Sequence, residues 1–101
     1  MNRFEAHGLV AYIEYNSPEE AWYAVQRQAG DINRWEHDVA GVMIDKTHSE
    51  PVIEAWLRGP DGQLAGTQLA RIATGARRSD RWSGIQRALE IIAVELQRRR
   101  K

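Results

Sequence analysis

The side chains that most often carry out chemistry are few and scattered in this sequence. His7, His37 and His48 lie far apart, so no two histidines share the four-residue spacing that places ligands on one helical face. Glu36, His37 and Asp38 form the one cluster of a histidine with acids. Three consecutive side chains diverge on a regular element, whereas a zinc site needs three or four ligands that converge. We therefore expect neither a metal site nor a cofactor.

The sequence also lacks an activated nucleophile. It contains no cysteine, and no serine lies in the Gly-x-Ser-x-Gly turn that exposes the nucleophile of many hydrolases. The serines are Ser17, Ser49, Ser79 and Ser83. Neighbouring acids such as Glu19 and Glu20 diverge on a helix and do not form a general acid–base pair. These observations predict a protein that is not an enzyme.

Basic residues of the C-terminal half form the most distinctive cluster. The overall net charge is zero, but residues 1–50 hold four basic against nine acidic residues, and residues 51–101 hold ten basic against five acidic. Such asymmetry predicts a molecule with one basic end, able to contact phosphates or an acidic protein surface. The candidate contact residues are Arg71, Arg77, Arg78, Arg81 and Arg87.

Aromatic residues are the second candidate feature. The chain has four tryptophans, and each buries about 150–250 Å² when it joins a core. A domain of this length buries only about two thirds of its extended surface, so its core is thin. We expect at least one large ring to stay exposed and to contact a partner, since exposed aromatic and arginine side chains are typical of interface hot spots. Trp35 and Tyr23 are the candidates.

A long C-terminal helix must organise the elements that carry these residues. Apolar side chains recur at steps of three and four through residues 79–100, which predicts one buried helical face. They are Trp82, Ile85, Leu89, Ile92 and Leu96. Ser79 or Asp80 can cap the first turn, and residues 98–101 form a frayed basic tail that complements the helix dipole.

The first third of the chain predicts a strand followed by a helix. Residues 7–15 are rich in branched and aromatic side chains and alternate loosely, which favours a strand. Ser17, Pro18 and Glu20 then match a helix start, with a cap, a first-position proline and a capping-box acid. The predicted helix ends at Gly30 and places Tyr23 away from its buried face. Residues 31–38 are expected to be irregular or to form one helical turn.

The middle of the chain predicts a three-stranded antiparallel meander. The strands are residues 42–44, 52–57 and 63–72, and Gly59-Pro60-Asp61-Gly62 supplies the turn between the last two. Residues 74–79 form a loop before the long helix. A mostly helical alternative stays open, because residues 50–58 and 64–73 also fit helical spacing. The predicted fold is a small single α+β domain spanning residues 1–101.

Bulk properties place the chain among ordinary globular domains. Apolar residues make up 43% and charged residues 28% of the sequence. No apolar run approaches the roughly 18 residues of a membrane-spanning helix, and the N-terminus lacks the apolar segment of a signal peptide. We expect a cytoplasmic protein with no membrane partner, either a monomer or a homodimer.

In overall character the chain resembles the small proteins that phages and mobile elements encode against host defence, anti-CRISPR inhibitors in particular. It is short, free of cysteine, rich in tryptophan and arginine, and without a catalytic set. The resemblance implies a non-enzymatic binding protein that sterically blocks a larger protein or nucleoprotein complex, such as a surveillance complex in the host cytoplasm. The alternative is a module that binds nucleic acid directly through its basic C-terminal half.

Overall fold

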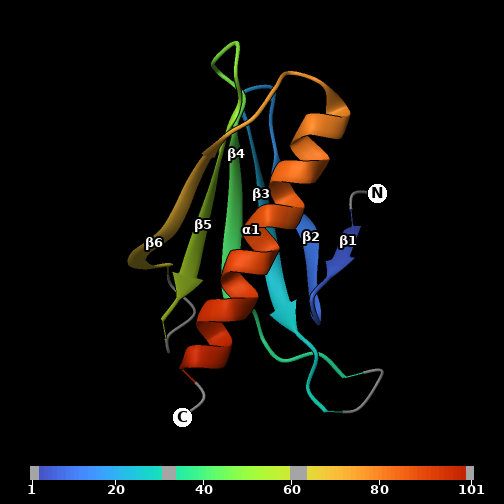
Figure 1. Cartoon of the computed structure of the whole chain (residues 1–101), viewed down its shortest axis with the longest axis vertical. Coiled ribbons are helices and arrows are strands. Elements are labelled where there is room, and N and C mark those ends of the chain that lie inside the picture. Colours follow the sequence, from blue (N-terminus) through green and yellow to red (C-terminus); the bar gives the residue numbers. More distant parts are fainter. Residues whose placement is uncertain (1–2, 31–33, 60–63, 100–101) are drawn as a thin grey trace.

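A computed structural model describes residues 3–30, 34–59 and 64–99. The chain forms one antiparallel sheet of six strands, followed by one long helix (Figure 1). In chain order the elements are β1 (Arg3–Ala6), β2 (Leu9–Asn16), β3 (Glu20–Arg27), β4 (Ala40–Asp45), β5 (Val52–Arg58), β6 (Leu64–Ala73) and α1 (Arg78–Arg98). Each strand pairs with the next one along the chain. The α+β class is confirmed, but the sheet has six strands rather than three, and the mostly helical alternative is wrong.

The helix predicted over residues 18–29 is strand β3. Ser17 does make the predicted contact, because its Oγ accepts a hydrogen bond from the Glu20 amide at 3.1 Å. The Ser17 amide, however, donates to the Glu20 carbonyl at 2.8 Å, which closes a hairpin between β2 and β3. A Ser-x-x-Glu signal therefore serves a strand turn here, and strand alternation replaces the expected helical spacing.

Strand β1 was missed, and the strand predicted from residue 7 begins at Leu9. His7 and Gly8 adopt φ angles of +56° and +76°, which join β1 and β2 through a two-residue turn. Turns with two positive φ angles match the twist of paired strands and favour glycine. The strands predicted at 42–44, 52–57 and 63–72 are confirmed with slightly different bounds, whereas the turn predicted at residues 59–62 falls mostly outside the described residues.

Helix α1 covers one face of the sheet, as Figure 1 shows, and packs mainly on β5 and β6. The predicted stripe is confirmed: Ile85, Leu89 and Ile92 are buried, and Trp82 and Leu96 are half-buried beside them. The expected cap is wrong, because the N-cap residue is Arg77 and no side chain caps the first turn. Among the described residues no helix is long and apolar enough to cross a membrane.

One glycine lets α1 approach the sheet closely. A Cβ on Gly84 would lie 2.5 Å from Ile53 Cδ1 and 2.6 Å from Thr74 Cγ2, so a larger residue would push these side chains aside. The core between helix and sheet consists mainly of small and branched side chains, with Tyr23 as its buried aromatic residue. Val25, Val42 and Ile53 have no exposed surface, and no buried polar or charged side chain is found in the described part of the chain.

Candidate functional site

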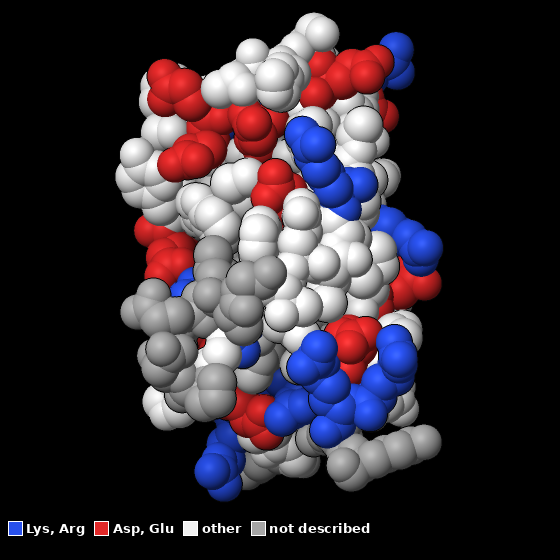
Figure 2. Space-filling model, turned by 90° about the vertical axis from the view of Figure 1, so that its left-hand side faces the viewer, with Lys and Arg blue, Asp and Glu red and all other residues white. Residues whose placement is uncertain are grey.

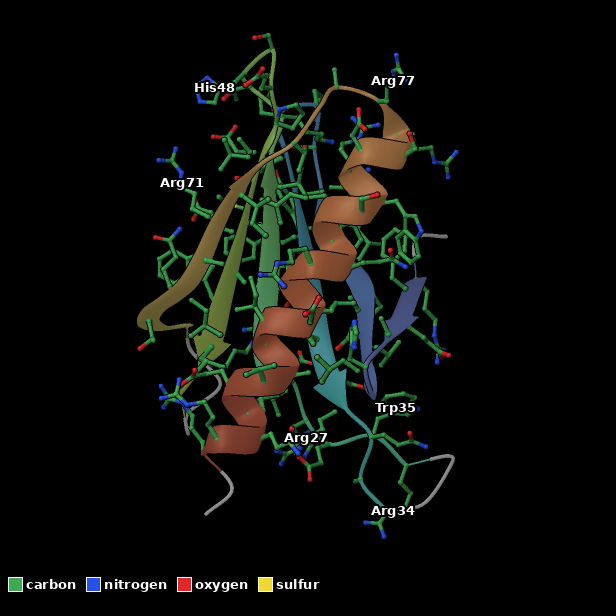
Figure 3. The ribbon with its side chains drawn as sticks, viewed as in Figure 1. Arg27, Arg34, Trp35, His48, Arg71 and Arg77 are labelled. Carbon is green, nitrogen blue, oxygen red and sulfur yellow. The ribbon has the colours of Figure 1, made fainter. Side chains whose placement is uncertain are left out.

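The predicted arginine cluster is divided between β6 and α1, and Figure 3 shows the separation of Arg71 from Arg77. Arg77, Arg78 and Arg81 lie together at the start of α1. Arg87 lies further along the helix and forms a salt bridge with Glu90 at 3.0 Å. The expectation of one continuous basic patch is therefore wrong, although three of its members remain neighbours.

Arg71, the fifth predicted arginine, lies on β6 and faces away from α1. It stands directly opposite Glu54 of β5, whose side chain is on the side of the sheet that the helix does not cover. At this position the Arg71 guanidinium contributes, as one of the smaller causes, to a lowered pKa of Asp45. Arg71 therefore belongs to a different surface from the arginines of the helix.

The two aromatic residues predicted to contact a partner, Tyr23 and Trp35, also lie in different parts of the structure. Tyr23 is only 4% exposed and packs against Phe4 with ring centroids 5.5 Å apart. The expected exposure of Tyr23 is wrong, because residue 23 lies on the core side of a strand rather than on a helix. Trp35 is half-buried in the connection after β3, where it bridges to Gln28, and it lies at the opposite end of the molecule from Arg77 (Figure 3).

The described residues contain no group of three or more histidine and acidic side chains close enough to hold a metal ion. His48 approaches the carboxylate of Asp45 at 3.7 Å, and both side chains are partly exposed. This pair alone provides neither the ligand number nor the enclosure of a metal centre.

The side of the sheet opposite α1, called the outer face below, carries a row of aromatic, methionine and charged side chains. Strand registers place one row of directly opposite residues across it, namely Tyr15, Trp22, Met43, Glu54 and Arg71. Tyr15 is 53% exposed, and Trp22, Met43 and Glu54 are half-buried. Within the described ranges α1 is the only helix, so no second layer covers this row.

A β-bulge in β2 turns one acid toward the outer face. Ile13 pairs with Tyr23 and Tyr15 pairs with Trp22, so Glu14 is the extra residue of the bulge. Its carboxylate accepts a hydrogen bond from Arg58 of β5 at 2.9 Å, although two strands lie between them. In a flat sheet, β2 and β5 would lie roughly 14 Å apart. The side chains of Glu14 and Arg58 must therefore lie across the sheet surface to meet. Ala24 and Gly41, both buried, leave room for them.

A second polar network adjoins this ion pair. Tyr12 donates its hydroxyl to Asp38 Oδ1 at 2.6 Å, and Gln26 Nε2 donates to the same oxygen at 3.1 Å. Burial raises the pKa of Tyr12 to about 12, and the hydrogen bond and charge of Asp38 act in the same direction. The hydroxyl therefore stays protonated at neutral pH, where it can donate a hydrogen bond but cannot act as a base.

The β4–β5 end of the outer face is acidic. Asp45 Oδ1 accepts hydrogen bonds from the Thr47 hydroxyl at 2.6 Å and from the Thr47 amide at 3.0 Å. These two bonds hold the pKa of Asp45 below its ordinary value. Glu54 in turn accepts a hydrogen bond from the indole nitrogen of Trp56 at 3.0 Å, which orients an aromatic ring beside the row.

The two sides of the molecule thus differ in charge. By register and hydrogen bonding the outer face carries more acids than bases: its acids are Glu5, Glu14, Glu20, Asp38, Asp45 and Glu54, and its bases are Arg3, Arg58 and Arg71. Residues 77–99 carry six arginines against three acids. Figure 2 looks onto the β6 edge and shows acidic side chains gathered at the upper left and basic ones mostly toward the right and below. The charge asymmetry between the two halves of the sequence corresponds only in part to two sides of the fold, because Arg58 and Arg71 of the second half lie on the outer face.

Sequence reasoning missed the outer face because it placed residues 18–29 in a helix. Helical spacing groups Trp22 with Val25 and Ala29 as a buried set, whereas strand alternation separates Trp22 from Tyr23 and Val25. The alternation of residues 20–27 was present as a signal. The sequence contained no such signal for the ion pair between Glu14 and Arg58, because this pair depends on a bulge and on the order of four strands.

Comparisons of this chain with protein families, with curated proteins and with solved structures found no match. Its function must therefore be inferred from its own geometry.

Proposed function

We propose that this chain is a non-enzymatic binding protein that uses its outer face to cover a surface of a larger protein or nucleoprotein complex. The observation that carries the proposal is the uncovered row of Tyr15, Trp22 and Met43, flanked in register by Glu54 and Arg71. Aromatic, methionine and arginine side chains are enriched at protein interfaces and supply much of the binding free energy at hot spots.

The charges beside this row specify the chemistry of the partner. The acidic side chains of the outer face favour a partner surface with basic groups around an apolar centre. The Glu14–Arg58 pair and the Tyr12–Asp38 bond hold their side chains in place before binding. Such preorganisation lowers the entropy that association would otherwise cost.

Steric inhibition is the mode of action we propose for such a binder. A rigid sheet that covers the working surface of a complex blocks it without any chemical step. An inhibitor of the anti-CRISPR type, which the chain resembles in overall character, would act on a surveillance complex in this way. Purified surveillance complexes provide a direct test, because an inhibitor of this type prevents them from engaging their DNA target.

Affinity capture with matched variants tests the proposed face. The outer-face variant combines Tyr15→Ser with Met43→Gln, and the control is Val94→Ser on α1. Tyr15 and Val94 are 53% and 54% exposed, so the control removes an apolar side chain of the same exposed fraction as Tyr15 from the opposite side of the molecule. We expect a protein from the source cells to be retained by the wild type and by the control but not by the outer-face variant. Equal retention by all three would contradict the proposal.

The competing proposal is direct binding of nucleic acid through Arg77, Arg78 and Arg81. It predicts that the isolated protein shifts labelled DNA or RNA at low salt, and that the shift weakens steeply as salt rises. Replacing the three arginines by glutamine would then abolish the shift, while the outer-face variant would keep it. The outer-face proposal expects no shift from the isolated protein.

A further inference from the structure

A pocket of about 510 Å³ lies between the first half of α1 and the sheet face that the helix covers. It forms where the helix, which packs mainly on β5 and β6, passes over the opposite half of the sheet. The pocket is thus on the other side of the sheet from the outer face and shares none of its row residues. Its lining residues are Phe4, Asn16, Ala21, Tyr23, Ile44, Lys46, Arg78, Ser79, Arg81, Trp82 and Ile85.

The inner wall of the pocket is apolar and aromatic. The rings of Phe4 and Trp82 lie 4.4 Å apart between centroids, and Tyr23 contacts the other side of Phe4. Ala21 and Ile44, from neighbouring strands, face the same space. Because Ala21 has a short side chain, the strand leaves a volume here that a larger residue would fill. Such a wall favours a flat ring or an alkyl chain.

The rim of the pocket is basic. Lys46, Arg78 and Arg81 line it, and no carboxylate does. Lys46 Nζ is held by the Asn16 side chain at 3.1 Å and by the Ser17 carbonyl at 2.8 Å. Among the described residues none of the three cations forms a salt bridge, although the chain has fourteen acids.

We infer that this pocket binds a small organic anion with an apolar ring or chain. The ring or chain would lie against Phe4 and Trp82, and the anionic group would meet Lys46, Arg78 and Arg81 at the rim. Ligand pockets typically enclose about 300–1,000 Å³, with a mostly apolar lining and few polar groups. The combination of an aromatic wall with three cations and no acid selects for negative charge on an apolar body. This site is independent of the proposed docking function.

A pair of probes that differ in charge tests the inference. 1-Anilinonaphthalene-8-sulfonate is an apolar anion, and N-phenyl-1-naphthylamine has nearly the same ring system without the charge. We expect the anion to bind at least about tenfold more tightly in a fluorescence titration, since only the anion can form charge-assisted hydrogen bonds with the rim cations. Amide chemical-shift changes should centre on Ala21, Ile44 and Ser79. Equal affinity for the two probes, or shift changes confined to other regions, would overturn the inference.

Matched variants then separate the pocket cations from the general charge of the helix. Arg78→Gln with Arg81→Gln removes two rim cations, and Arg77→Gln with Arg87→Gln removes two cations that do not line the pocket. The first variant should lose about tenfold in affinity for the anion and keep its affinity for the neutral probe, whereas the control keeps both. Equal losses in the two variants would mean attraction by the basic helix alone and would reject the site.

A third variant changes the volume of the pocket without changing its charge. Ala21→Val fills part of the inner wall on a strand that tolerates branched residues. We expect weaker binding of both probes, with an unfolding transition that stays cooperative in urea. Unchanged affinity for both probes in this variant would place the probes outside the pocket and contradict the inference.

Discussion

The two faces of the sheet are built from the same strands but from different kinds of residue. The face under α1 is composed mainly of alanine, valine, isoleucine and leucine, with Phe4 and Tyr23 as its aromatic members, and Val25, Val42 and Ile53 there have no exposed surface. The outer face presents tyrosine, tryptophan and methionine beside carboxylates. In β3 the division occurs within one strand, since Tyr23 is buried while Trp22, its neighbour in sequence, is on the outer face.

This difference assigns a separate task to each face. Branched aliphatic side chains stabilise the fold, because their burial against α1 removes apolar surface from water. Aromatic rings and carboxylates contribute less to stability when half exposed, but they suit contact with a partner. One strand can therefore serve folding and recognition at once, provided that its alternation is kept.

Truncation of a core residue provides the largest expected contrast between the faces. Leu89→Ala removes a fully buried side chain of α1 and should lower the free energy of unfolding by about 2–5 kcal/mol. Tyr15→Ala removes a half-exposed outer-face ring and should lower it by about 0.5 kcal/mol or less. Urea unfolding of both variants measures the difference, and similar losses would show that the outer face is part of the core.

Much of the fold followed from local patterns. The stripe of α1 was readable because Ile85, Leu89 and Ile92 repeat over several turns, and burial needs that spacing whatever the rest of the chain does. Strands β4 and β5 were readable from branched residues. Strand β3 was not, since Ser17 binds the amide of Glu20 in the same way in a hairpin as in a helix cap.

The candidate site was less predictable than the fold. The arginines were expected to act together because they are close in sequence, yet Arg71 lies on the outer face and Arg78 on the rim of the pocket. Both surfaces depend on strand order and on the path of α1 over the sheet. These are properties of tertiary packing, which residue spacing alone does not encode.

Removal of the Glu14–Arg58 ion pair, which crosses the outer face, should have an intermediate effect on the free energy of unfolding. Glu14→Gln removes the charge that faces Arg58, whose side chain is only 15% exposed. We expect a loss of about 1 kcal/mol in the free energy of unfolding, because the carboxylate is about half exposed and solvent screens the pair. A double-mutant cycle with Arg58→Gln measures the coupling. Coupling near zero would show that the pair does not order this face.

Tyr12, which donates a hydrogen bond to Asp38, should make the free energy of unfolding depend on pH in the alkaline range. The pKa of Tyr12 is raised to about 12 from 10.0 in the folded chain, so the folded state holds this proton more tightly than the unfolded state does. The resulting stabilisation is complete below pH 10 and is lost as pH rises toward 12. Urea unfolding of the wild type and of Tyr12→Phe, measured between about pH 9 and pH 12, should show that the free energy of unfolding declines less in the variant. Parallel declines would contradict the network around Asp38.

The smallest expected effect concerns the acidic end of the outer face. Thr47→Val removes the hydroxyl bond to Asp45 and keeps the amide bond, so the pKa of Asp45 should rise part of the way toward its ordinary value. Because the pKa of Asp45 is lowered in the folded wild type, this carboxylate stabilises the fold at pH values above its ordinary pKa. That stabilisation is lost as the pH falls through the pKa of the folded state. Carbon-13 titration of the carboxyl group measures this shift. Arg71→Gln should raise the same pKa less, since the charge of Arg71 is a smaller cause than the Thr47 bonds. If Arg71→Gln had the larger effect, the charge pattern of this face would be set by pairing across the sheet rather than by the β4–β5 turn, and the partner chemistry inferred for it would need to change.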